Sequence, residues 1–424
     1  MKRSGCVIIF AVFLLCASLL PAQSNPNEEQ GLKPYDSWYG GDLDSVSMTH
    51  GGLVLHIPLV SFPQRGNLDL SFMIRYSSKV WQVRGVCQGQ PPHQICTENW
   101  LPAPNTGAQI VSSQDWWLQK SFGLDDPGFD WTQGVTSPDG NTHQFGNVLN
   151  GPAETFPLRS LDSTGLLFDG TNVILPNGTR YNYTNGLGTS KFGGTQPSAI
   201  TDANGNQITV SASGWADTLG RVIPGSRQSS SFPMQPGVPT SDLSTCPTGT
   251  ASALVWNVPG PANVNSGIRT YKFCYSNFTI QTNFNPGSSP TDYSGTMSLL
   301  SAVVLPDLTM WTFNYDNYAD IKSVGFPTGG SITYTYVTGP ITCSTGTTRS
   351  VAVATRTVDA NDGTGGHQWT YNYNVGLSGG TTKVTLLRSR MILSTPFQIL
   401  SRADADSMTR RCSITRAPAA AEPS

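Results

Sequence analysis

The sequence predicts an all-β fold in which repeated β-hairpins form a large, curved antiparallel sheet, with no significant helix beyond an N-terminal signal segment. Two observations support this. The chain of 424 residues has 44 Gly and 30 Pro but only 12% charged residues, whereas an ordinary soluble domain has about 25%. A short turn phrase also recurs: Pro, then Asp, Asn or Thr, usually followed by Gly. Alternating Thr and aromatic residues follow it, which is typical of a tight turn that leads into a strand.

The turn phrase occurs four times, each time with Phe or Tyr a few positions later. The copies lie at residues 138–145, 176–183, 306–316 and 327–336. Pro306 and Pro327 are 21 residues apart, within the range of periods typical of repeat architectures. Because a single repeat unit cannot bury its apolar face alone, such chains are usually scaffolds or containers.

The first 24 residues have the pattern of a cleaved signal peptide. Lys2 and Arg3 precede an apolar run of about 14 residues, and small residues near Ser24 suit cleavage. That run is short for a bilayer span, and no later stretch is long and apolar enough. We therefore expect a secreted or cell-surface protein whose mature chain has no membrane span. The net charge of −2 provides no positive field to hold nucleic acid.

Composition divides the remaining chain into regions. We expect a disordered linker at residues 25–45 and an N-terminal β region at 46–135, whose Trp-rich insertion is irregular at 82–115. A hairpin-repeat region with a loop insertion at 221–265 follows at 136–385. The tail at 386–424 is expected to be disordered or aberrant, as a truncation or frameshift would produce. The N-terminal β region contains an amphipathic hairpin at 53–76, whose apolar residues alternate at period two.

Six cysteines remain after cleavage, and an exported protein can form disulfides. Cys87 and Cys96 bracket a Pro-rich loop and are the best local pair. Cys246 and Cys274 flank a strand expected at 254–258 and are the second choice. Unpaired thiols are the alternative to both. The absence of a Cys-x-x-Cys motif argues against a structural zinc site.

Residues 311–321 resemble a tyrosine–aspartate (YD) repeat of the RHS family of exported bacterial proteins. Tyr315, Asp316 and Ile321 match the family pattern, whereas Leu308 and Ala319 stand where Gly is usual. Segments 52–76, 200–210 and 331–336 also resemble members of this family. We expect the Tyr to pack against neighbouring strands and the Asp to accept backbone N–H bonds in the following turn.

The resemblance implies a long β-sheet that spirals into a hollow shell, which encloses or presents a C-terminal effector. The family's core segment and effector are not found in this sequence. The expected function is therefore a non-enzymatic structural scaffold without cofactors, whose partner is a C-terminal effector or another cell-surface component.

No catalytic, cofactor-binding or metal-ligating residues stand out. The five histidines have no metal-ligand spacing, and we expect His143 and His367 to face solvent. Residues 376–380 match the nucleophile-elbow pattern, but a strand-like sequence follows where a helix is needed. Residues 359–363 lack the Glu of a calcium loop and indicate a turn. The alternative function is a secreted carbohydrate-binding protein or glycosidase that uses the Trp-rich segment 100–131.

Overall fold

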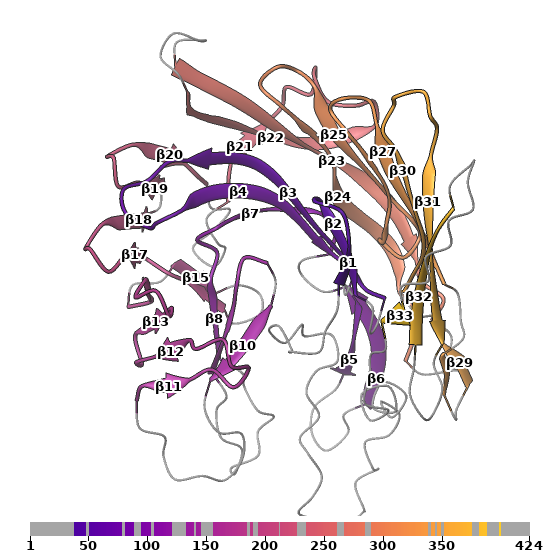
Figure 1. Ribbon diagram of the computed structural model, residues 1–424, viewed down its shortest axis with the longest axis horizontal. Helices are drawn as coiled ribbons and strands as arrows, with labels where there is room; N and C mark the ends of the chain where they lie inside the picture. Colours follow the sequence, from indigo (N-terminus) through magenta and orange to yellow (C-terminus); the bar gives the residue numbers. More distant parts are fainter. Residues whose placement is uncertain are drawn as a thin grey trace, which may run out of the picture.

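The computed structural model consists of antiparallel β-sheets, with no α-helix in the part of the chain that it describes (Figure 1). Within that part, no helix is long and apolar enough to cross a membrane. The all-β prediction is confirmed. The described residues are 38–47, 51–78, 81–88, 95–102, 106–120, 133–139, 141–145, 156–184, 187–189, 194–211, 213–226, 235–260, 267–284, 290–337, 341–343, 346–348, 352–374, 381–387 and 398–399.

The N-terminal sheet has the strand order β1-β2-β3-β4-β7. Strands β3 and β4 form the predicted hairpin, in which Leu55 pairs with Tyr76 and Phe62 with Leu70. The side chains of Leu70, Phe72, Ile74 and Tyr76 are buried, as the period-two pattern predicts. The bounds are β1 Trp38–Gly40, β2 Asp44–Ser47, β3 Leu53–Phe62, β4 Leu70–Ser77 and β7 Gln109–Ser112.

The largest sheet has eleven strands, from β21 to β33. Each strand pairs with the next one in the chain, except that β27 pairs with β30 and the hairpin of β28 and β29 lies between them in sequence. The bounds are β21 Val238–Thr240, β22 Thr250–Pro259, β23 Ile268–Gln281, β24 Ser294–Val304, β25 Met310–Tyr315, β26 Ile321–Gly325, β27 Ser331–Tyr336, β28 Ile341–Cys343, β29 Gly346–Thr348, β30 Val353–Asp359, β31 His367–Asn374, β32 Thr381–Leu387 and β33 Gln398–Ile399.

An eight-stranded sheet precedes it in the chain, in the order β11-β12-β13-β14-β17-β18-β19-β20. A single bridge between Ser226 and Gln235 follows β20 and leads toward β21. These strands are short, between two and five residues each. The bounds are β11 Leu158–Arg159, β12 Leu167–Phe168, β13 Asn172–Ile174, β14 Arg180–Asn182, β17 Ala199–Thr201, β18 Gln207–Ser211, β19 Gly214–Ala216 and β20 Val222–Pro224.

Two smaller sheets complete the N-terminal half. One has five strands in the order β10-β9-β8-β16-β15, and the other is the hairpin of β5 and β6. A bridge between Phe145 and Ser160 links β10 to the start of the eight-stranded sheet. The bounds are β5 Trp81–Gln88, β6 Ile95–Pro102, β8 Trp117–Lys120, β9 Gln133–Thr136, β10 Thr142–Phe145, β15 Leu187–Thr189 and β16 Gly194–Gln196.

The N-terminal sheet packs against both longer sheets. Phe72 of β4 marks the junction: its ring centroid lies 5.0 Å from that of Trp215 on β19 and 4.7 Å from that of Trp256 on β22. In Figure 1 the indigo strands β3 and β4 lie along the inner side of the orange strands. Most buried apolar side chains of the three sheets belong to one cluster, and Cys274, Ala302 and Val304 form a separate small one. The curved outer strands therefore share their core with the N-terminal sheet.

Six hairpin turns share one backbone arrangement. In each, the first residue donates its N–H to the carbonyl of the fifth, and the fourth donates back to the first. The fourth residue has a positive φ, as in a three-residue hairpin loop that ends in a left-handed residue. These fourth residues are Gly178, Gly205, Gly220, Leu308, Ala319 and Gly329. Four are glycine, which adopts this backbone without steric cost, whereas Leu308 and Ala319 adopt it despite their Cβ atoms.

The structure corrects three predicted boundaries. Strand β1 and the start of β2 lie inside the expected linker 25–45, of which residues 25–37 lie outside the described residues. The insertion 82–115, expected to be irregular, contains β5, β6 and β7, and the loop 221–265 contains β20, β21 and β22. Strand β7 pairs with the distant β4, but β5 pairs with β6 and β21 with β22 inside the same segment. Cross-strand pairing thus stabilises strands that residue composition alone does not indicate. Most of the tail 386–424 lies outside the described residues.

Candidate functional site

The segment that resembles a YD repeat is the hairpin of β25 and β26. Its turn begins at Asp316, whose Oδ1 accepts the backbone N–H groups of Tyr318 at 2.8 Å and Asp320 at 3.0 Å. This is the turn-closing role expected from the sequence. Ile321 follows as the first residue of β26 and is fully buried. Asp316 therefore acts on the backbone of its own turn.

Tyr315 directs its side chain into the core, where it links three segments. Its hydroxyl donates to the Leu300 carbonyl at 2.9 Å and accepts the Ala108 N–H at 3.0 Å. Its ring packs edge-on against Phe278. Burial raises the pKa of Tyr315 well above its ordinary value. The hydroxyl consequently keeps its proton and remains a hydrogen-bond donor throughout the physiological pH range.

The same contact occurs one unit later. Tyr336 donates to the Ile321 carbonyl at 2.7 Å, and in both contacts the acceptor lies 15 residues before the tyrosine. Tyr336 follows Tyr315 by 21 residues, the spacing of Pro306 and Pro327. These two prolines begin the loops of the hairpin turns whose left-handed residues are Leu308 and Gly329. The 21-residue spacing is thus a structural period of two strands and two turns.

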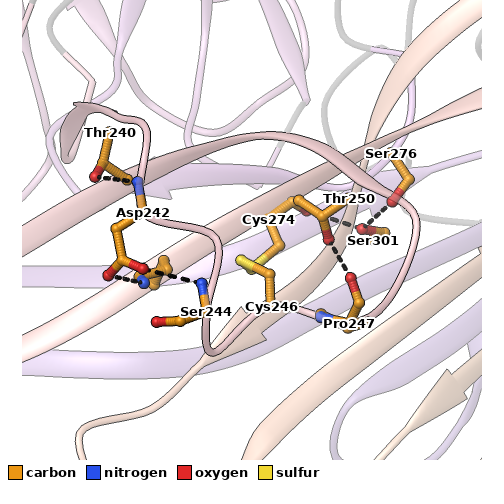
Figure 2. Close-up of a disulfide and its surroundings, with 10 residues drawn as sticks. Thr240, Asp242, Ser244, Cys246, Pro247, Thr250, Cys274, Ser276 and Ser301 are labelled. Atoms are coloured by element: carbon orange, nitrogen blue, oxygen red, sulfur yellow. Dashed lines mark hydrogen bonds and ion pairs between the residues drawn. A yellow bond between two sulfur atoms is a disulfide. The ribbon is translucent and has the colours of Figure 1, made fainter.

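Of the two predicted cysteine pairs, the structure describes one as a disulfide and gives backbone positions for the other. Cys246 and Cys274 are joined by a disulfide, with Cα atoms 5.8 Å apart (Figure 2). It links the loop after β21 to β23, and the Cys274 side chain is fully buried. Cys87 on β5 and Cys96 on β6 occupy directly opposed backbone positions.

Figure 2 also shows how the disulfide loop is held at both ends. Lys272 donates to the Asp242 carboxylate at 2.8 Å, and Thr250 donates to the Pro247 carbonyl at 2.7 Å. Hydrogen bonds from Lys272 and Ser244 hold the pKa of Asp242 below its ordinary value. This segment falls in the expected loop insertion, and the structure shows it fastened to the large sheet.

A pocket of about 540 Å³, lined by both apolar and polar side chains, lies between the N-terminal sheet and the hairpins of β9, β10, β13 and β14. Trp116, from the predicted Trp-rich segment, lines this pocket. Its ring stacks on His143 with centroids 6.0 Å apart, and it packs against Tyr181 at 5.1 Å. Trp116 therefore uses its ring to hold neighbouring side chains of the protein.

Ser137, His143 and Asp162 form a connected row beside this pocket. The Ser137 Oγ lies 3.2 Å from the His143 Nε2, and the His143 Nδ1 lies 2.5 Å from the Asp162 Oδ2. Burial raises the pKa of Asp162, but hydrogen bonds from Thr164 and His143 outweigh it and leave the pKa below its usual value. His143 is buried and only 7% exposed, so the prediction that it faces solvent is wrong.

This row of three residues could not be predicted from the sequence, because the residues come from different structural elements. Ser137 follows β9, His143 lies on β10, and Asp162 follows β11 in another sheet. The bridge between Phe145 and Ser160 brings β10 and β11 together. No spacing rule along the chain signals that contact, since the order of strands across sheets is set by tertiary packing.

The remaining sequence candidates have structural explanations or lie outside the described residues. Residues 359–363 form a turn in which Asp359 accepts the Asn361 N–H and Asp362 accepts the Thr364 N–H. Within the described ranges, no group of three His, Cys, Asp or Glu side chains could hold a metal ion. Residues 376–380 lie outside the described residues.

No protein-family model matches this chain, and no curated protein matches it significantly in sequence.

Proposed function

We propose that this protein is an exported structural scaffold that resembles the shell-forming part of RHS proteins and encloses or presents an effector polypeptide. The observation that carries the proposal is the 21-residue period of a tyrosine hydrogen bond. Tyr315 and Tyr336 each donate to a carbonyl 15 residues earlier, so each unit is stabilised by the preceding one. Such dependence between neighbours is typical of repeat scaffolds.

The hairpin turns support the same proposal. One turn arrangement recurs at six places along residues 175–330, in the eight-stranded and the eleven-stranded sheets. Repeating one short unit lengthens a sheet, and the twist between neighbouring strands lets the long sheet curve gradually. A long, curved wall suits enclosure of another polypeptide better than recognition of a small molecule.

The position of the N-terminal sheet also supports the proposal, because its strands would close one end of such a shell. Tyr76 of β4 accepts the backbone N–H of Ile321 at 3.1 Å, and Trp81 donates to the Tyr318 carbonyl at 2.7 Å. The N-terminal strands thus pack on the unit that contains Tyr315 and Asp316. They would cap one end of an enclosed space.

The proposal is tested by protease protection. The wild-type chain is expressed in its native host together with the polypeptide encoded immediately downstream, and the secreted material is purified through the scaffold. We expect a complex in which the downstream polypeptide is digested at least several-fold more slowly than alone. The double variant Tyr315→Phe, Tyr336→Phe should lose part of this protection, whereas Tyr39→Phe, a partly exposed control, should not. Equal digestion rates with and without the wild-type chain would refute the proposal.

A further inference from the structure

We propose that Ser137, His143 and Asp162 act as nucleophile, general base and orienting carboxylate in the hydrolysis of neutral carboxylic esters bound in the adjacent pocket. No enzymatic activity is expected from the sequence, and the geometry of these three residues departs from that expectation. The inference does not depend on the scaffold proposal, because a wall that encloses another polypeptide can also carry a reactive site.

The hydrogen bonds have the order that an activated serine needs. The contact of 2.5 Å between the His143 Nδ1 and the Asp162 Oδ2 places the ring proton on Nδ1, since the carboxylate can only accept. In the neutral imidazole that carries this proton, the Nε2 atom can accept a proton from the Ser137 Oγ, which lies 3.2 Å away. Nucleophile, base and orienting group are each within hydrogen-bond reach of the next, which is the recurrent arrangement of hydrolytic triads.

Neighbouring groups hold the row in place. Oδ1 of Asp162 accepts the Thr164 hydroxyl at 2.6 Å and the Thr164 N–H at 3.2 Å, so Oδ2 remains directed at the imidazole. The ring of Trp116 stacks on His143 with an interplanar angle of 19°. A base whose orientation is set on both sides transfers a proton more readily than a mobile one.

The reaction balances with water as the only co-reactant. The Ser137 oxygen attacks the ester carbonyl carbon while its proton moves to the His143 Nε2. The C–O bond to the alcohol then breaks, and the alkoxide takes that proton. A water molecule, deprotonated by His143, releases the acyl group as a carboxylic acid and restores Ser137. Asp162 stabilises the imidazolium that forms in each half of the cycle.

The pocket indicates which esters fit. Its volume of about 540 Å³ falls within the range of small-molecule sites. The carboxylates of Asp69 and Asp139 line it, whereas none of the described residues that line it is Lys or Arg; the nearby Arg75 donates to the Pro138 carbonyl at 3.4 Å. Anionic substrates would be repelled, so a neutral ester with a short acyl group is the class expected.

Asp139 also sets the reactivity of the serine. The Ser137 hydroxyl contacts the Asp139 carboxylate and lies 3.1 Å from the Asn141 carbonyl. These acceptors compete with His143 for the hydroxyl proton. Modest turnover is therefore expected, and covalent labelling of the serine is the more sensitive measurement.

The test uses the full secreted chain with a fluorophosphonate probe and with p-nitrophenyl acetate. We expect one phosphonyl adduct, mapped by peptide mass spectrometry to Ser137, and ester hydrolysis that falls by roughly 100-fold in Ser137→Ala and His143→Gln. Asp162→Asn should lower kcat with little change in KM, as a positioning residue would. Ser252→Ala, an exposed serine on β22, should behave as the wild type.

Two results would overturn the inference: an absence of labelling in the folded wild-type chain, or ester hydrolysis that is unchanged in Ser137→Ala. Melting temperature and circular dichroism establish that each variant is folded. Should Ser137→Ala fail to fold, the site of the adduct in the wild type and its loss in His143→Gln decide the question instead.

Discussion

Asp44 on β2 and Arg356 on β30 form a buried, bidentate ion pair across 312 positions of sequence. The Arg356 Nε lies 2.5 Å from the Asp44 Oδ2, and its Nη2 lies 2.7 Å from Oδ1. The Tyr334 hydroxyl donates to the same carboxylate at 2.8 Å, and the guanidinium lies over the Trp369 ring. The first strands of the chain are thereby tied to the far end of the largest sheet.

Arg356→Met should lower the free energy of unfolding by about 3–5 kcal/mol, because it leaves the Asp44 carboxylate buried without a counter-ion. Tyr334→Phe removes a single hydrogen bond and should cost about 1 kcal/mol. Urea denaturation measures both. The double variant Asp44→Asn, Arg356→Met should be less destabilised than the sum of its single changes, and strict additivity would contradict the coupling.

Leu308→Gly should stabilise the protein by roughly 1 kcal/mol, because the leucine is held at a φ of 68° that glycine adopts without steric cost. The Leu308 side chain is 68% exposed, so little packing is lost. Thermal denaturation would show a higher melting temperature. The matched control is Gly329→Ala at the corresponding position of the next unit, where a Cβ would lie 2.8 Å from the Asn361 Nδ2. That variant should be destabilised, and the same sign of effect in both would contradict the turn assignment.

Asp316→Ala should lower the free energy of unfolding by about 1 kcal/mol. The change removes the acceptor of the Tyr318 and Asp320 N–H groups. Asp316→Asn retains an oxygen at that position and should cost less than half as much, as measured by urea denaturation. Equal losses in Asn and Ala would show that the carboxylate does not close the turn.

Removal of the disulfide by Cys246→Ala with Cys274→Ala should lower stability by about 3–4 kcal/mol. The two cysteines are separated by 28 residues, and opening a loop of that length increases the entropy of the unfolded chain accordingly. Denaturation of the wild type with and without a reducing agent provides the comparison. A wild type whose midpoint is unaffected by reduction would contradict this prediction.

The wild type should lose stability relative to Asp115→Asn as the pH rises from about 4 to 6. Burial raises the pKa of Asp115 to about 6, although hydrogen bonds from Ser112 and Gln196 oppose the effect. An unfolded chain releases this proton near pH 4. Between these values the folded state binds more protons, so this group's contribution to stability falls with rising pH, by on the order of 3 kcal/mol in total. Above about pH 6 the difference should be constant.

Denaturation curves of wild type and Asp115→Asn at several pH values check this sign. The variant has no titrating group at this position, so the difference between the two chains isolates Asp115 from every other carboxylate. Parallel pH dependence in the two chains would contradict the raised pKa.

Much of the local structure could be predicted because turn chemistry and strand alternation are short-range. Pro306 and Pro327 open the hairpin loops in which Leu308 and Gly329 have positive φ. The alternation from Leu70 to Tyr76 predicts the buried face of β4. Composition does not indicate the strands in the expected linker and in the two expected insertions, because cross-strand pairing stabilises them, within the segment for β5 with β6 and β21 with β22 and outside it for β7 with β4.

The sequence by itself determined the β class, the 21-residue period and the turn at Asp316, since all three depend on neighbours within about twenty residues. Only the tertiary structure decided that β2 meets β30 through Asp44 and Arg356, and that His143 lies between Ser137 and Asp162. Those contacts join elements whose proximity depends on how whole sheets pack together. That packing minimises exposed apolar surface over the entire chain, and no short stretch of residues encodes it.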